Sequence, residues 1–216
     1  MKTLDKIAEH IATSLLDIEA VTLRPHNPFT WTSGIQSPIY CDNRLTMSHP
    51  EIRGAIADGF TALISEKFPE VEAIAGTATA GIPHAAWVSE RLNLPMIYVR
   101  DKAKGHGKEN QIEGMLKPGQ KVVVIEDLIS TGGSSIKAGE AIRASGGESL
   151  GVTAIFSYQL KRAVQAFAQA NLPLYTLTNY TILLDVAVKK GYIQEQDLEQ
   201  LQAWRKNPSS YGIRQA

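Results

Sequence analysis

Four consecutive β-branched residues, Val122 to Ile125, form an apolar run that two carboxylates, Glu126 and Asp127, follow directly. Such a run is typical of a strand buried on both faces, as in a parallel sheet with helices above and below it. Small residues, Ser130 to Ser134, come next, and a helical pattern of apolar residues follows them. This order of strand, polar loop and helix restricts the chain to an α/β fold, with polar groups where the central strand should end.

Short apolar segments alternate with helical patterns along most of the chain. Strands are expected at residues 73–75, 96–99, 122–125, 151–156 and 174–177. Helices are expected at residues 3–19, 50–67, 82–92, 134–144, 161–170 and around 198–204. This alternation predicts a parallel twisted sheet that helices cover on both sides. A chain of 216 residues can bury one good core, so we expect a single domain, with or without a small appendage.

The charged residues balance, with 22 Lys and Arg against 22 Asp and Glu. Zero net charge gives no reason to expect nucleic acid or anionic lipid as a partner. Because the sequence contains no run of 18 apolar residues and no signal-like apolar core near its start, we expect no membrane segment. Cys41 is the only cysteine, which excludes an internal disulfide and fits a reducing cytoplasm. The five histidines are scattered and suggest no metal site.

The segment from Ser130 to Ser134 has the residue types of a phosphate cradle. Small and hydroxyl-bearing residues at a helix N-terminus leave backbone N–H groups free to bind a phosphate. The carboxylates of Glu126 and Asp127, just before this cradle, can accept hydrogen bonds from sugar hydroxyls. A site that binds a phosphate and a diol side by side is suited to a ribose 5-phosphate group. The alternative is an ordinary connection in which Ser and Thr only cap the helix.

Two further segments should lie at the same edge of the sheet. Residues 76–83, Gly-Thr-Ala-Thr-Ala-Gly-Ile-Pro, are small up to Gly81, so their backbone can approach a polyanion closely. Residues 100–110 carry four cations and one histidine just after a strand, as a lid that closes over a departing pyrophosphate would. The alternative for residues 76–83 is a plain turn between a strand and a helix. The alternative for residues 100–110 is a solvated, charge-rich connection.

Residues 122–134 resemble the phosphoribosyl pyrophosphate (PRPP) signature of type I phosphoribosyltransferases, and they lack the Gly-Lys-Ser/Thr triplet of P-loop NTPases. Nearly the whole chain resembles orotate phosphoribosyltransferases. The resemblance is carried by residues 76–83, by the Arg-x-x-x-Lys-x-His-Gly lid from Arg100, and by the Ser-Gly and Ser-Pro pairs within residues 29–40. It implies an enzyme of de novo pyrimidine (UMP) biosynthesis that joins orotate to PRPP, giving orotidine 5′-phosphate and pyrophosphate, with Mg2+ as cofactor.

The resemblance also implies roles for individual residues. Catalysis would depend on Asp127, Lys104 and His106, and orotate would contact Ser130 and Arg44. PRPP would be bound by Thr77, Ala78 and Thr79, by Arg100, Lys104 and His106, and by Glu126, Asp127, Leu128, Ile129, Ser130, Thr131, Gly132, Gly133 and Ser134. Magnesium would be held by hydroxyls, phosphates and water with at most one carboxylate, so no protein ligand is assigned to it.

The same resemblance implies how the chain is organised. Residues 1–216 would form a single phosphoribosyltransferase domain, in which residues 1–48 and the C-terminal helix contribute a small hood and the dimer surface. In this family the lid reaches across a dimer into the partner's site. A cytoplasmic homodimer with shared active sites is therefore expected.

The chain departs from the family pattern at three places. Asp101 follows the lid arginine where many members have lysine, and Thr32 replaces a lysine before the early Ser-Gly. Residues 157–159, Ser-Tyr-Gln, replace an Asp-Arg pair that helps to bind the orotate carboxylate. Another cation must then meet that carboxylate, and Arg44 is the nearest candidate in sequence. Two other functions stay open, a purine-type phosphoribosyltransferase and a regulator that binds PRPP without turning it over.

Overall fold

The computed structural model describes residues 3–30, 36–101 and 111–208. Its centre is a six-stranded sheet in the order β10-β9-β8-β5-β6-β7, parallel except for the last strand. The strands are β5 (Ala73–Thr77), β6 (Met96–Val99), β7 (Ile112–Glu113), β8 (Lys121–Ile129), β9 (Glu148–Ser157) and β10 (Leu174–Asn179). The predicted parallel sheet is confirmed, with the two-residue antiparallel β7 as an addition. Thr32, Lys104 and His106 lie outside the described residues.

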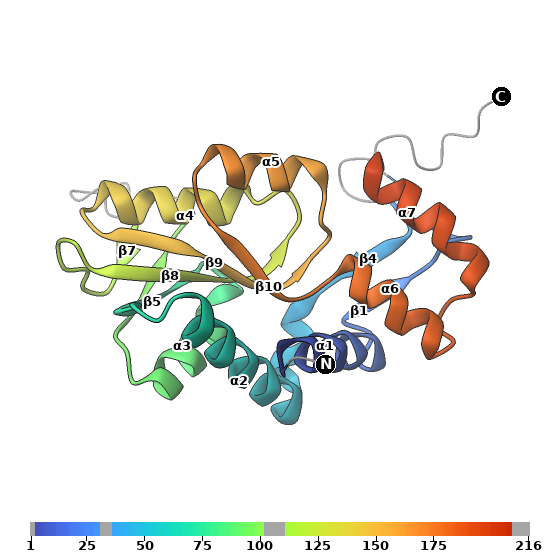
Figure 1. Cartoon of the computed structure of the whole chain (residues 1–216), viewed down its shortest axis with the longest axis horizontal. Helices are drawn as coiled ribbons and strands as arrows, with labels where there is room; N and C mark the ends of the chain where they lie inside the picture. Colours follow the sequence, from blue (N-terminus) through green and yellow to red (C-terminus); the bar gives the residue numbers. More distant parts are fainter. Residues whose placement is uncertain (1–2, 31–35, 102–110, 209–216) are drawn as a thin grey trace.

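Helices cover both faces of this sheet (Figure 1). One face carries α1 (Thr3–Asp17), α2 (Pro50–Lys67) and α3 (Gly81–Leu92), and the other carries α4 (Gly133–Ala144) and α5 (Lys161–Gln169). Val123 and Ile125 pack into the core with the first group, whereas Val122 and Val124 pack with the second. The apolar run of β8 is therefore buried on both faces, as its sequence predicted.

The smaller elements lie at one end of the sheet (Figure 1). The N-terminal part adds two short antiparallel ladders and a 3-10 helix, formed by β1 (Val21–Leu23), β2 (Phe29–Thr30), β3 (Gln36–Ser37), β4 (Ile39–Cys41) and η1 (Asn43–Ser48). The C-terminal part adds α6 (Tyr180–Lys189), η2 (Glu195–Asp197) and α7 (Leu198–Lys206). Trp204 of α7 is fully buried and packs against the rings of Tyr158 and Tyr180. The C-terminal helix thus shares the main core.

The sequence predicted that Glu126 and Asp127 would follow the central strand. This prediction is wrong, because both residues belong to β8. β8 continues to Ile129 because it pairs with β9 as far as Ser157. On its other side, pairing with β5 stops at Ile125. Glu126 and Asp127 therefore lie inside a strand but beyond the last residue that pairs with β5. Within the described part of the chain, no helix is both long enough and apolar enough to cross a membrane.

Candidate active site

A cavity of about 520 Å3 opens at the carboxyl ends of β5 and β8. It brings together segments that are distant in the sequence, from the turn before η1, the loop after β5, the end of β8 and the start of α4. Residues 126–128 and 130–135 form the largest part of its wall. Ala78 and Thr79, in the loop after β5, also line it. Ile129 is an exception among the predicted contacts, because it is fully buried in the core.

The loop from Ser130 to Ser134 depends on one glycine for its shape. Gly132 caps α4 with a left-handed backbone (φ +81°), and its carbonyl accepts a hydrogen bond from Ile136 N at 3.0 Å. The N–H groups of the first turn of α4 have no acceptor within their own helix. Together with the helix dipole, these donors make the start of α4 suitable for a phosphate. Ser130 to Ser134 thus form the loop and the start of the helix that the sequence predicted there, and phosphate binding by them stays a prediction.

The two carboxyl groups at the end of β8 differ in their surroundings. Glu126 is only 8% exposed, and its Oε2 accepts a hydrogen bond from Ser135 Oγ at 3.1 Å while Oε1 accepts one from the Asp127 N–H at 3.0 Å. Burial, and next the charge of Asp127, raise the pKa of Glu126 to about 7. Burial also raises the pKa of Asp127, which is half-buried and lines the cavity. Burial and mutual repulsion thus disfavour a second negative charge on this pair.

The loop after β5 approaches the same cavity through small residues. A side chain at Gly81 would overlap the Ile125 carbonyl oxygen of β8, so glycine permits α3 to start this close to the central strand. Thr77 Oγ1 donates to that same carbonyl at 3.1 Å, and Ala78 N donates to Val99 O at 2.9 Å. The peptide bond between Ala78 and Thr79 is cis. This loop is held between β6 and β8 with its small residues facing the cavity.

A second cavity, of about 330 Å3, adjoins the first. Thr77, Arg100 and Asp101 line it, and the two cavities share lining residues on the β5 loop and on α4. Arg100 Nη1 lies 3.3 Å from Glu113 Oε1 in a partly exposed ion pair. Lys137 lines both cavities, although it is not among the site residues predicted from the sequence. Its position one helical turn after Ser134 is the signal that could have identified it.

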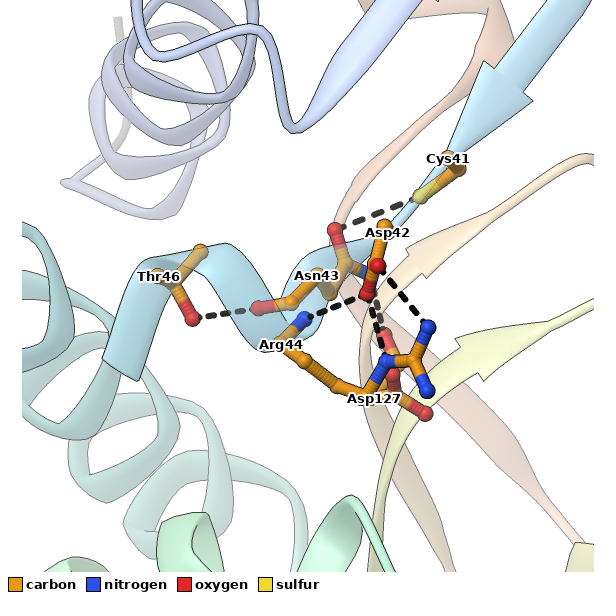
Figure 2. Close-up of polar contacts among 6 residues, drawn as sticks. All are labelled: Cys41, Asp42, Asn43, Arg44, Thr46 and Asp127. Carbon is orange, nitrogen blue, oxygen red and sulfur yellow. Dashed lines mark hydrogen bonds and ion pairs between the residues drawn. The ribbon is translucent and has the colours of Figure 1, made fainter. Parts of the chain in front are cut away.

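Arg44 lines the larger cavity but is already paired with a neighbouring carboxylate. Its Nε and Nη2 bind Asp42 Oδ1 and Oδ2 at 2.6 and 2.8 Å (Figure 2). The hydrogen bonds from Arg44 lower the pKa of Asp42. Tyr158 is buried against Phe156 and Trp204, and the Oε1 of Gln159 accepts hydrogen bonds from Thr181 and Arg205. The residues in place of the family's Asp-Arg pair thus serve packing and local structure.

Comparison with known proteins identifies the family. The phosphoribosyl transferase domain model matches residues 48–170. The orotate phosphoribosyltransferase of Halalkalibacterium halodurans is 64% identical over 202 residues, which are 94% of this chain and 96% of that protein. The chain belongs to the orotate phosphoribosyltransferase family. The Bacillus subtilis orotate phosphoribosyltransferase is 61% identical and covers 93% of each chain.

A solved orotate phosphoribosyltransferase shares the fold. The crystal structure from Aeropyrum pernix superposes with a TM-score of 0.73 at 28% identity, covering 85% of this chain and 99% of the other. The type I phosphoribosyltransferase fold and the pentosyltransferase class, both expected from the sequence, are confirmed. Membership of the orotate phosphoribosyltransferase family excludes the non-catalytic regulator that the sequence alone left open.

Proposed function

We propose that the chain transfers the ribose 5-phosphate group of PRPP to orotate, forming orotidine 5′-phosphate and releasing pyrophosphate. The observation that carries this proposal is the shared cavity, in which the start of α4 lies beside the carboxylates of Glu126 and Asp127. One side offers donors for a phosphate and the other offers acceptors for a diol. The relatives named orotate phosphoribosyltransferase support orotate as the base, rather than a purine.

We assign the parts of PRPP to three segments. The 5′-phosphate binds to the backbone and hydroxyl groups of residues 130–134, with Leu128 and Ile129 placing that loop. The ribose hydroxyls bind to Glu126 and Asp127. The pyrophosphate binds to residues 77–79 and to the cations Arg100 and Lys104 with His106, and Lys137 is added here because it lines both cavities.

The reaction builds positive charge at the anomeric carbon while pyrophosphate leaves. Asp127, ionised beside that carbon, stabilises the transition state by its negative charge, and the cations stabilise the leaving group. Removing one well-placed electrostatic partner typically costs about 3 kcal/mol of activation free energy. No covalent nucleophile is needed, so none is assigned.

Magnesium fits the chemistry of this donor set. The ion binds through one or two carboxylates and the oxygens of phosphates and water, and it rarely uses an all-protein cage. Among the described residues, no group of three or more His, Cys, Asp or Glu side chains could hold a metal by itself. Asp127 is the carboxylate that would hold Mg2+ together with substrate oxygens. When bound, the ion supplies positive charge to the leaving pyrophosphate.

We assign orotate to the side of the cavity formed by Ser130 and Arg44. Binding of the orotate carboxylate by Arg44 requires the guanidinium to share its donors with Asp42, or to exchange one carboxylate for the other. A crystal structure with orotate and PRPP tests this directly. Orotate should lie with its carboxylate within hydrogen-bonding distance of Arg44, and an orotate carboxylate bound elsewhere would contradict the assignment.

We further propose that the chain is one domain whose residues 1–48 and C-terminal helix form the hood and dimer surface. The enzyme acts in the cytoplasm as a homodimer with shared sites. Lys104→Ala and Asp127→Ala should each be inactive, because one damages the lid and the other damages the ribose site. After joint refolding, about half of the dimers are mixed and each regains one good site, so roughly a quarter of parental activity should return. Mixed dimers without activity would contradict a lid that acts in the partner's site.

A further inference from the structure

A buried amide joins the N-terminal part of the chain to the carboxylate strand. The side chain of Asn43, at the start of η1, is fully buried. Its Nδ2 donates a hydrogen bond of 2.7 Å to the backbone carbonyl of Asp127, 84 residues away in the sequence (Figure 2). The contact is short and partly buried, and it ends on the residue that carries the site's half-exposed carboxylate.

The orientation of this amide is determined by its other contacts. Asn43 Oδ1 accepts a hydrogen bond from Cys41 Sγ at 3.3 Å, which leaves the NH2 group to face the carbonyl of Asp127. The Asn43 backbone carbonyl accepts a second bond from the buried Thr46 Oγ1 at 2.6 Å. The hydrogen bonds with Cys41 and Asp127 use both ends of the side-chain amide and set its orientation, whereas the bond from Thr46 holds only the backbone.

The backbone of Asp127 lies where β8 pairs with a strand on one side only, the side of β9. The ladder with β9 continues through Glu126 and Leu128, but β5 pairs with β8 only as far as Ile125. Beyond that point no strand in the described part of the chain pairs with β8 on its β5 side. Asn43 supplies a donor to the backbone at the position that the ladder with β5 no longer reaches.

We propose that Asn43 is a positioning residue, which directs the Asp127 carboxylate toward the ribose by holding the Asp127 carbonyl. This inference rests on the proposed function, in which Asp127 acts on the anomeric carbon. A displacement of about 1 Å at a reacting group can reduce the rate about a hundredfold. Loss of the Asn43 contact should consequently affect catalysis more than stability.

Two variants test the donated hydrogen bond. Asn43→Ala removes the amide, whereas Asn43→Leu keeps its approximate size, adds no charge and has no hydrogen-bond donor, so one remains informative if the other fails to fold. Each folded variant should lower kcat at least about tenfold, with KM for PRPP within about threefold of the parent. A folded Asn43→Leu enzyme with parental kcat would overturn the proposal.

Thr46→Val is the matched control. It removes the hydroxyl that binds the Asn43 backbone carbonyl and leaves the bond from Asn43 Nδ2 to Asp127 in place. Its kcat should stay within about twofold of the parent, even where its melting temperature falls as far as that of Asn43→Ala. Equal losses of kcat at equal losses of melting temperature would mean that Asn43 only stabilises the turn.

A double-mutant cycle separates positioning from general damage. In an Asp127→Asn background the carboxylate charge is already gone, so Asn43→Ala should lower kcat by less than about twofold further. A further loss as large as in the parent would show that Asn43 acts independently of Asp127. A parent that forms no orotidine 5′-phosphate would refute the proposed function, whereas an active parent with multiplying losses would refute only the role of Asn43.

Discussion

The ring of Phe167 in α5 lies against Gly132 so closely that a Cβ at position 132 would come within 2.5 Å of Phe167 Cε2. Gly132 also has the left-handed backbone (φ +81°) that L side chains rarely adopt. Glycine is thus required at this position of the proposed phosphate cradle for two independent reasons, and the contact ties residue 132 to the helix that follows β9.

Gly132→Ala should therefore lower stability by about 1–3 kcal/mol and raise KM for PRPP at least about tenfold, because both the strain and the ring contact displace the cradle. Gly133→Ala is the control, since a Cβ there meets no atom within 4 Å and its backbone is not left-handed. Urea unfolding and steady-state kinetics measure the two effects. Equal stability of the two variants would contradict the requirement for glycine at 132.

Glu126 should make stability depend on pH in a defined direction. The pKa of its carboxyl is raised from 4.5 to about 7 by burial and by Asp127, so the folded protein keeps this proton at pH values where the unfolded chain has lost it. The free energy of unfolding must then fall as pH rises from about 4.5 to about 7. At about 1.36 kcal/mol for each pKa unit, the contribution reaches at most about 3 kcal/mol.

Glu126→Gln removes this titration while keeping the size and an acceptor. Relative to the parent, the variant should gain stability between pH 5 and pH 7 and show a constant difference above pH 7. Urea unfolding at several pH values gives the difference directly. A stability difference that does not change with pH would mean that the carboxyl titrates near its ordinary range.

Lys137 should contribute to PRPP binding. Among the residues of α4, Lys137 is the cation that lines both cavities. Lys137→Ala should raise KM for PRPP about tenfold with a smaller change in kcat, which corresponds to loss of a hydrogen bond to a charged group. Lys161→Ala, an exposed lysine at the start of α5 that lines neither cavity, should have parental kinetics. Equal KM values in the two variants would remove Lys137 from the site.

Much of the fold could be predicted because its signals are local. The apolar run of β8 and the periodic spacing of apolar residues in α1 and α4 predict which faces of these elements are buried. This prediction does not require knowing which other elements pack against them. The small residues of the cradle likewise indicate backbone freedom directly. In contrast, the end of β8 depends on which neighbour stops first, and that information lies in β5 and β9.

Three further features escaped prediction. The helix α6 was not predicted, because its leucine and β-branched residues suit a strand as well as a helix. The signal that could have identified it is the N-cap residue Asn179, whose side chain accepts a hydrogen bond from Ile182 N at 3.1 Å. The contact between Asn43 and Asp127 joins residues 84 positions apart, and no local pattern encodes it. The ion pair of Arg44 with Asp42 joins residues two positions apart in the sequence, but the position of this pair at the cavity depends on the whole fold.

The most direct measurement is the rate of nucleotide formation from PRPP and Mg2+ with orotate, hypoxanthine, guanine or adenine offered separately. Orotate should be converted to orotidine 5′-phosphate with one pyrophosphate released per turnover, and Asp127→Asn should reduce that rate at least about tenfold without loss of fold. The purine bases should give no product above the background without enzyme. Turnover of any purine at a rate comparable to that of orotate would contradict the proposed function.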